Sequence, residues 1–122
     1  MKNKKYILSI SGGGIRGVIP AMFLHELFKR TGKHPTEIFD MFIGTSTGAI
    51  ISLLYNSPVK YSTEDVVDFY LGADAKKIFK GKTISLPWDT VKYPEKDIES
   101  VLQNKLKDYK LKDCIKPCVS VT

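Results

Sequence analysis

The sequence predicts an α/β fold whose sheet is mainly parallel. Short, largely apolar runs with β-branched or aromatic residues, at 6–10, 39–43 and 118–122, alternate with segments that have a helical pattern of apolar residues. A glycine-rich stretch follows the first run, and a turn of small residues follows the second. Strands that alternate with helices in this way pair in parallel through right-handed crossovers, with the helices covering the sheet.

The first strand and the first helix carry clear local signals. Residues 6–10 have the aromatic and β-branched composition of a short buried strand. The helix expected over residues 18–30 has its apolar side chains on roughly one side, and Pro20 fits its first turn, where a missing N–H costs nothing. Lys29 and Arg30 suit the negative end of the helix dipole, and we expect Gly32 to end the helix.

The second strand and helix follow directly. An apolar run at residues 39–43 is expected to form a strand that Gly44 breaks. Residues 49–55 are an apolar helical segment, which the Asn-Ser-Pro sequence at 56–58 stops. This second strand–turn–helix unit therefore repeats the order of the first.

The remaining segments predict two helices and a third strand. Ser62 with Asp65 resembles a capping box and starts a helix that is expected to reach about residue 79, with Gly72 as a weak point. Residues 80–93 have no period and are expected to be irregular. Pro94 then opens a helix with an apolar stripe, and residues 118–122 begin a strand at which the sequence stops, in what we interpret as the middle of a fold.

Length and composition fit one small domain over residues 1–122. The chain is 43% hydrophobic and 26% charged, which argues against disorder, collagen-like repeats and a coiled coil. A net charge of +6 favours peripheral contact with anionic surfaces such as a membrane. The lysines are scattered, and no arginine cluster, zinc spacing or aromatic pattern predicts a nucleic-acid partner.

Neither a leader, a membrane span nor a metal site is expected. The apolar run after the basic start of the chain is too short for a signal peptide or a span, so we expect an intracellular protein, cytoplasmic or peripheral to a membrane. Cys114 and Cys118 lie close together and are expected to be free thiols. His25 and His34 lie far from them in sequence, and no Cys-x-x-Cys occurs, so no metal ligand set is predicted.

The glycine-rich loop after the first strand has three interpretations: nucleotide binding, oxyanion stabilisation or a plain turn. Gly12, Gly14 and Gly17 match the G-x-G-x-x-G spacing of a dinucleotide-binding loop. That interpretation needs an acidic residue after the second strand, but Glu37 and Asp40 precede or begin it. A P-loop fails because Val18 follows Gly17 where Lys is required.

The turn after the second strand, GTSTG at residues 44–48, has the G-x-S-x-G pattern of a nucleophile elbow. It lies between an apolar strand and an apolar helix, which is the context that the elbow requires. Small flanking residues, Gly44, Thr45, Thr47 and Gly48, permit a sharp turn that exposes the Ser46 hydroxyl.

The two loops follow neighbouring parallel strands and should therefore open at the same edge of the sheet. Attack of Ser46 on an ester would create an oxyanion, which backbone N–H groups near Gly13, Gly14 and Ile15 are placed to stabilise. No histidine follows Ser46, and His25 and His34 are expected to be surface or boundary residues. A carboxylate acting directly on the serine is the remaining common base.

At this point the chain resembles the amino-terminal part of the patatin-like phospholipases. The resemblance rests on SGGGIRG at residues 11–17, on GTSTG at 44–48 with FDMFIG leading into it, and on the later KYPEKDIESVLQNKL and LKDCIKPCVSVT. It spans nearly the whole chain. The pair of motifs at this spacing is far more specific than either motif alone.

The resemblance implies a three-layer α/β/α fold and hydrolysis of lipid or phospholipid acyl esters by a Ser-Asp dyad, without a cofactor. Ser46 corresponds to the nucleophile and Gly13, Gly14 and Ile15 to the oxyanion donors, while Arg16 is given an electrostatic or structural role in the loop. The family's aspartate lies in Asp-Gly-Gly or Asp-Gly-Ala, and no Asp in this sequence precedes Gly. We therefore expect a truncated domain that lacks the catalytic aspartate.

Three functions follow as hypotheses. The first is a patatin-like lipid acyl hydrolase that requires an aspartate from another segment. The second is a catalytically inactive remnant or lipid-surface-binding protein, in which Trp88 with Leu86, Pro87 and nearby lysines touches a membrane. The third and weakest is a dinucleotide-binding module.

Overall fold

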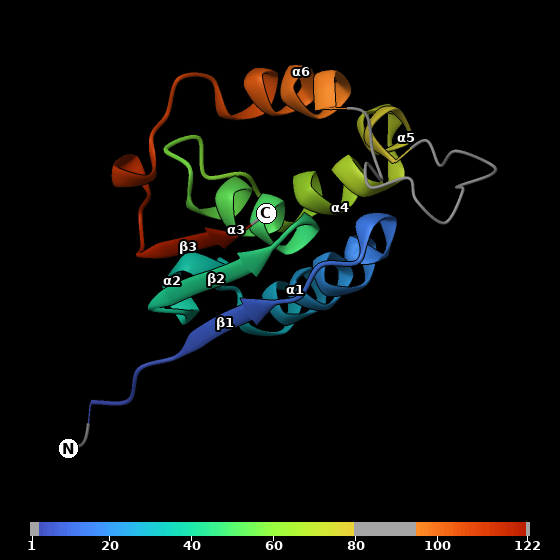
Figure 1. Ribbon diagram of the computed structural model, residues 1–122. Helices are drawn as coiled ribbons and strands as arrows, with labels where there is room; N and C mark the ends of the chain where they lie inside the picture. Colours follow the sequence, from blue (N-terminus) through green and yellow to red (C-terminus); the bar gives the residue numbers. More distant parts are fainter. Residues whose placement is uncertain (1–2, 80–94, 122) are drawn as a thin grey trace.

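Three parallel strands form one sheet (Figure 1). The computed structural model describes residues 3–79 and 95–121. Within them, β1 (Ile7–Ile10), β2 (Met41–Thr45) and β3 (Cys118–Val121) lie in the order β1-β2-β3. Ile7 pairs with Met41, and Phe42 pairs with Cys118, in parallel register. The predicted α/β class with a parallel sheet is thereby confirmed.

Helices connect the strands and follow the predicted order. Their bounds are α1 Val18–Thr31, α2 Pro35–Ile38, α3 Thr47–Asn56, α4 Thr63–Leu71, α5 Ala73–Ile78 and α6 Glu95–Leu106, with short 3₁₀ turns at Gly14–Gly17 and Leu111–Asp113. The expected helices at 18–30, 49–55 and from 62 are therefore present, each within a few residues of its predicted bounds. No helix within the described parts of the chain is long and apolar enough to cross a membrane.

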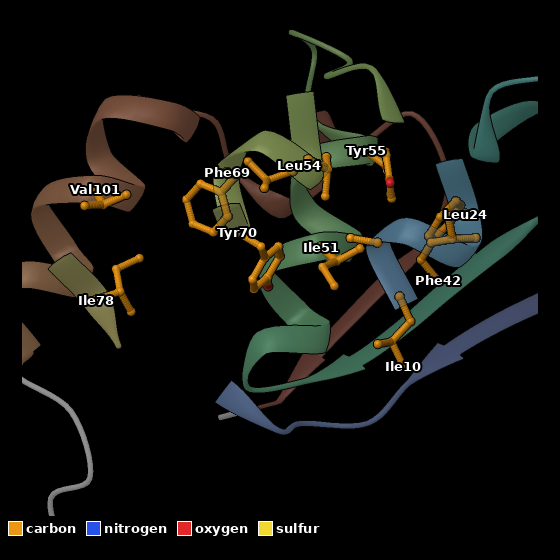
Figure 2. Packing of buried hydrophobic residues seen from close by; sticks show 12 residues of the cluster. Ile10, Leu24, Phe42, Ile51, Leu54, Tyr55, Phe69, Tyr70, Ile78 and Val101 are labelled. Atoms are coloured by element: carbon orange, nitrogen blue, oxygen red, sulfur yellow. The ribbon is translucent and has the colours of Figure 1, made fainter. Parts of the chain in front are cut away.

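Both crossovers run in the same direction across the sheet, so right-handed connections place α1 and α3 on the same face. The core lies between this face and the helices. Figure 2 shows Ile10 and Phe42 of the strands gathered with Leu24 of α1 and Ile51 of α3, and all four side chains are buried. The core then extends through α4 and α5 to Val101 of α6.

The opposite face of the sheet is open within the described residues. Side chains alternate along a strand, so Ile7, Val119 and Val121 point away from the core, and they are 57%, 43% and 48% exposed. Met41 and Ile43, which lie between them in β2, are only partly buried. The second helical layer of a three-layer fold is thus not formed by residues 3–79 and 95–121.

Local signals explain most helix ends. Ser62 and Asp65 form the predicted capping box: the Asp65 N–H donates to the Ser62 hydroxyl, and the Ser62 N–H donates to the Asp65 carboxylate. Gly32 ends α1 in the left-handed conformation, with φ of 67°. The predicted helix from residue 62 is split at Gly72, whose ψ of −170° interrupts the helical path and separates α4 from α5.

Two predicted details are wrong. The second strand runs from Met41 to Thr45, not over residues 39–43, because Phe39 caps the unpredicted short helix α2. Gly44 continues the strand and does not break it. A Cβ at Gly44 would lie 2.3 Å from the Gly48 carbonyl carbon, so this glycine permits α3 to approach β2 closely.

Some of the predictions for residues after 79 can be compared with the structure. The helix predicted to open at Pro94 is present as α6, which begins at Glu95, and the strand at the end of the sequence is present as β3. The predicted irregular segment 80–93, including Leu86, Pro87 and Trp88, lies outside the described residues. The membrane contact proposed for Trp88 therefore stays a prediction.

Candidate active site

Ser46 occupies the turn between β2 and α3 in a conformation that few non-glycine residues adopt. Its φ is 52° and its ψ is −121°. Its N–H donates to the Val121 carbonyl at 2.9 Å, and its carbonyl accepts from the N–H groups of Ala49 at 2.9 Å and Ile50 at 3.2 Å. These three hydrogen bonds, to β3 and to the first turn of α3, fix the strained turn, and Ser46 itself is exposed, as a nucleophile elbow requires.

The glycines of GTSTG are required by close packing. A Cβ at Gly48 would lie 2.1 Å from the Ile10 carbonyl oxygen, which is far inside contact distance. The first turn of α3 therefore rests directly on the end of β1. Thr47, between Ser46 and Gly48, is buried, whereas Thr45 is exposed at the end of β2.

The glycine-rich loop lies against the elbow. The Gly12 N–H donates to the Thr45 hydroxyl at 2.9 Å, although the two residues are 33 positions apart. A Cβ at Gly12 would lie 2.9 Å from the Ser46 Cβ, so only glycine lets the loop approach so closely. The expectation that the two loops open at the same edge of the sheet agrees with these contacts.

The N–H groups of Gly13, Gly14 and Ile15 have no protein acceptor among residues 3–79 and 95–121. The chain turns sharply here, with φ of 58° at Gly14, and the 3₁₀ turn of residues 14–17 follows. Donors at the start of such a turn have no partner within it. The role of these three N–H groups as oxyanion donors stays a prediction.

Arg16 closes the loop on itself. Its backbone N–H donates to the Gly13 carbonyl at 3.2 Å, and its side-chain Nε donates to the same oxygen at 3.4 Å. Of the two roles considered for Arg16, these contacts support the structural one, since both hold the loop in its turned shape.

Tyr70 of α4 contacts both loops, through Thr47 of the elbow and Gly17 of the glycine-rich loop. The sequence did not single it out. Its hydroxyl donates to the Thr47 carbonyl at 3.2 Å and is also hydrogen-bonded to the Thr47 hydroxyl. A Cβ at Gly17 would lie 2.7 Å from the Tyr70 ring and 2.6 Å from the Thr47 hydroxyl oxygen. Burial raises the pKa of Tyr70 to about 12, although the Thr47 hydrogen bond opposes the shift, so the phenol stays a neutral donor.

Nothing in the sequence marks Tyr70 as special. It belongs to the apolar stripe of a predicted helix, where an aromatic residue is ordinary core. Its hydroxyl acquires a role only because the fold brings α4 under the elbow, and that placement depends on contacts between distant segments.

Both histidines have structural partners. His25 Nδ1 is hydrogen-bonded to the Thr63 hydroxyl at 2.9 Å, and His34 bonds to Thr36 and to the Tyr61 carbonyl. Asp40 lies at the other end of β2 from Ser46, where its carboxylate accepts from the Tyr6 N–H at 3.0 Å. Both histidines are partly buried, which agrees with the expectation that they are surface or boundary residues.

No cluster of three His, Cys, Asp or Glu residues that could hold a metal ion occurs in the part of the chain that the structure describes. Cys114 and Cys118 are free thiols, and partial burial raises the pKa of both. None of the described Asp, Glu or His side chains is hydrogen-bonded to the Ser46 hydroxyl.

Comparison with known proteins decides the family. The family model described as patatin-like phospholipase matches residues 8–121. The chain belongs to the patatin-like phospholipase family. The match includes both the glycine-rich loop and the serine elbow, together with all three strands but for the first residue of β1.

Curated relatives of this patatin-like chain come from plants and animals. It is 34% identical to patatin-like protein 2 of Arabidopsis thaliana over 86% of the chain and 30% of the relative. It is 32% identical to calcium-independent phospholipase A2-gamma of Homo sapiens over 82% of the chain and 13% of the relative. For patatin-T5 of Solanum tuberosum the values are 33%, 82% and 28%. The chain therefore spans less than a third of the length of these relatives.

Proposed function

We propose that this chain supplies the nucleophile and the oxyanion donors of a lipid acyl hydrolase. The observation that carries the proposal is the direct contact between two motifs: Ser46 in a strained, exposed turn, with the open N–H groups of residues 13–15 in the loop packed against it. Membership of the patatin-like phospholipase family supports acyl esters of phospholipids or related lipids as the substrate class.

In the proposed reaction, Ser46 Oγ attacks the ester carbonyl carbon while a base takes the hydroxyl proton. The N–H groups of Gly13, Gly14 and Ile15 donate to the oxyanion that forms, each good donor contributing about 3 kcal/mol to lowering the barrier. Collapse breaks the bond to the leaving alcohol, which receives the proton from the base. Water then hydrolyses the acyl-serine by the same route in reverse.

The proposal assigns no base within these 122 residues. The family resemblance places the aspartate in Asp-Gly-Gly or Asp-Gly-Ala, and no Asp in the sequence is followed by Gly. When the base of such a catalytic set is missing, the catalysis that remains comes from the oxyanion donors and substrate binding, not from the serine. From the chain by itself a Ser46-dependent rate is therefore expected only at high pH, where hydroxide can take the serine proton, and a larger one is expected where an aspartate is supplied.

Hydrolysis of a fluorogenic short-chain ester at high pH, where hydroxide can replace the missing base, tests the proposal. We expect Ser46→Ala to lower the rate by roughly tenfold or more, because the nucleophile is removed while the fold is kept. Ser9→Ala is the matched control, since Ser9 is an exposed serine of β1 on the open face of the sheet. Equal rates for the wild type and Ser46→Ala would exclude Ser46 as the nucleophile.

A second candidate is a catalytically inactive lipid-binding protein. It is favoured by the absence, among the described residues, of any acidic or imidazole partner for the Ser46 hydroxyl. The net charge of +6 would attract such a protein to anionic lipid surfaces. Sedimentation with anionic vesicles together with no Ser46-dependent hydrolysis would support this candidate over the enzyme.

A further inference from the structure

A groove without charged side chains follows β1, which is an outer strand of the described sheet (Figure 1). Residues 8–11 form one wall of this edge groove, and Ile19, Pro20, Phe23 and Leu24 of α1 form the other. Ile19 and Phe23 are 65% and 68% exposed, although both are large and apolar. They lie one helical turn apart, so they form a continuous apolar surface on one side of α1.

The backbone of β1 offers hydrogen-bonding groups along the same edge. Tyr6 faces β2, because its N–H donates to the Asp40 carboxylate and its carbonyl accepts from the Asp40 N–H. Backbone groups alternate in direction along a strand, so those of Ile7 and Ser9 face away from β2. No strand of residues 3–79 and 95–121 lies on that side of β1. A further strand can therefore join the sheet there, beside the edge groove.

Basic side chains flank the edge groove at both ends of β1. Lys4 and Lys5 precede the strand, Arg16 follows it, and all three are exposed. The Lys5 ammonium lies 3.7 Å from the Asp40 carboxylate, whereas neither Lys4 nor Arg16 has a carboxylate partner among the described residues. The edge groove thus has an uncharged apolar centre between two positive ends.

A lipid surface and a second copy of the chain fit these features less well. Lipid chains have no donors or acceptors for the backbone groups of an edge strand, and burial of such groups without partners is costly. Self-pairing of β1 by two-fold symmetry is antiparallel, so Lys4 and Lys5 of each copy would lie near Arg16 of the other. Lysine beside an edge strand opposes such self-pairing.

We propose that the edge groove binds an extended segment of another protein, in which a short run of alternating apolar residues is flanked by acidic residues. The segment adds a strand beside β1, pairs with its outward backbone groups and places its apolar side chains against Ile19 and Phe23. Its acidic flanks lie near the two positive ends, in either strand direction. This edge of β1 faces away from β2 and Ser46, so the inference does not depend on the role of Ser46.

A fluorescein-labelled peptide, Asp-Asp-Val-Thr-Val-Thr-Val-Asp-Asp, tests the proposal by fluorescence anisotropy with the full chain. We expect saturable binding that weakens as the salt concentration rises from about 50 to about 500 mM, because salt screens the charged flanks. Proline at the three central positions keeps the charge but removes backbone donors, and lysine in place of aspartate reverses the charge. Each change should weaken binding by roughly tenfold or more. No binding, or equal binding of the three peptides, would overturn the proposal.

Phe23→Glu tests the position of the bound peptide. Phe23 is 68% exposed, so the new carboxylate enters the edge groove without entering the core. The substitution removes an aromatic contact and repels the acidic flanks, so we expect peptide affinity to fall by roughly tenfold or more. Leu71→Glu is the matched control, because Leu71 is 62% exposed on α4 and does not line the edge groove. Equal losses from the two substitutions would contradict the assignment.

Two further measurements separate this partner from the other occupants. A dimer in sedimentation velocity that Phe23→Glu dissociates would overturn the proposal in favour of a second copy. Binding to phosphatidylglycerol vesicles that Phe23→Glu abolishes, without binding of the acidic peptide, would overturn it in favour of a lipid surface. A monomer that binds the peptide through Phe23 supports it, whether or not Ser46→Ala changes ester hydrolysis.

Discussion

The two strand-to-helix turns of this molecule occupy equivalent places in the fold but have opposite backbone designs. The turn from β1 to α1 extends through residues 11–17, is rich in glycine and leaves three N–H groups open. The turn from β2 to α3 is concentrated at Ser46, which adopts a strained φ of 52° and presents a side chain. Two repeats of one supersecondary unit thus provide different chemical groups, a set of donors and a hydroxyl.

The difference shows why the glycines cluster where they do. Where the first turn approaches Ser46 most closely, at Gly12, it needs a residue without a Cβ, whereas the nucleophile proposed at Ser46 needs one Cβ held in a single position. Each turn then constrains the other. Gly12 packs on Ser46, Gly48 packs on Ile10, and Gly17 packs on Thr47, so the two turns form one closely packed unit.

Gly48→Ala should break this unit most severely. Its Cβ would lie 2.1 Å from the Ile10 carbonyl oxygen, and backbone atoms on both sides cannot move away easily. We expect the free energy of unfolding, measured by urea denaturation, to fall by about 3 kcal/mol or more, which is the upper part of the range for overpacking.

Gly32→Ala is the control for the intrinsic effect of losing a glycine. Nothing lies within 4 Å of a Cβ at Gly32, although its φ is +67°. The substitution should therefore cost only the left-handed strain, about 1 kcal/mol. If Gly48→Ala is no more destabilising than Gly32→Ala, the two turns are not packed as closely as described.

The sequence predicts the parts of this arrangement that depend on local chemistry. Helix ends at Gly32 and Ser62, the parallel order of strands and the pairing of the two loops all follow from glycine, capping and periodicity signals. The capping and glycine signals act within a few residues of the structure that they determine, and the parallel order of the strands then brings the two loops to the same edge of the sheet. The position of Ser46 at an exposed turn is predictable for the same reason.

The parts that escaped prediction depend on tertiary contacts. The strand at Met41–Thr45 includes Gly44 because α3 packs closely against it. The local sequence pattern instead predicts that this glycine ends the strand. The hydroxyl of Tyr70 reaches Thr47 only after α4 has packed under α3. The open face of the sheet was also not predictable, since alternation shows which side chains share a face but not what covers it.

Tyr70→Phe tests whether the two turns depend on each other. It removes the hydroxyl that bonds to Thr47 while retaining the ring that packs against Gly17. The Thr47 carbonyl and hydroxyl both lose a buried partner, so the free energy of unfolding should fall by about 2 kcal/mol. If Tyr70 positions the elbow, kcat for ester hydrolysis should fall while KM changes little, when both are measured well below the unfolding temperature. A reduced melting temperature with unchanged kcat would show that Tyr70 only stabilises the fold.

Tyr61→Phe is the matched control for that substitution. The Tyr61 hydroxyl donates to the Lys105 carbonyl at 2.8 Å, and neither residue takes part in the two turns. It should cost about 1 kcal/mol of stability, as for a partly exposed hydrogen bond, and leave kcat unchanged.

The smallest expected effect concerns His34, whose hydrogen bonds to Thr36 and Tyr61 lie away from the two turns. Its Nδ1 accepts from the Thr36 N–H at 3.2 Å, and its Nε2 donates to the Tyr61 carbonyl at 2.9 Å, which requires the neutral ring. Burial lowers the pKa of His34; nearby Lys60 acts in the same direction, while the Tyr61 hydrogen bond and Glu37 oppose the shift.

A folded-state pKa below the unfolded value means that the unfolded chain binds the extra proton first. Stability should therefore be complete above about pH 6.5, the ordinary pKa of histidine, and should decrease as the pH falls from there toward the lower folded-state value. His34→Asn retains a capping side chain but does not titrate in this range, and it loses the Tyr61 contact at a cost of about 1 kcal/mol. Urea denaturation of both proteins from pH 8 to pH 5 should thus give a smaller slope for the variant. Parallel profiles would mean that another group, in either repeat, causes the pH dependence.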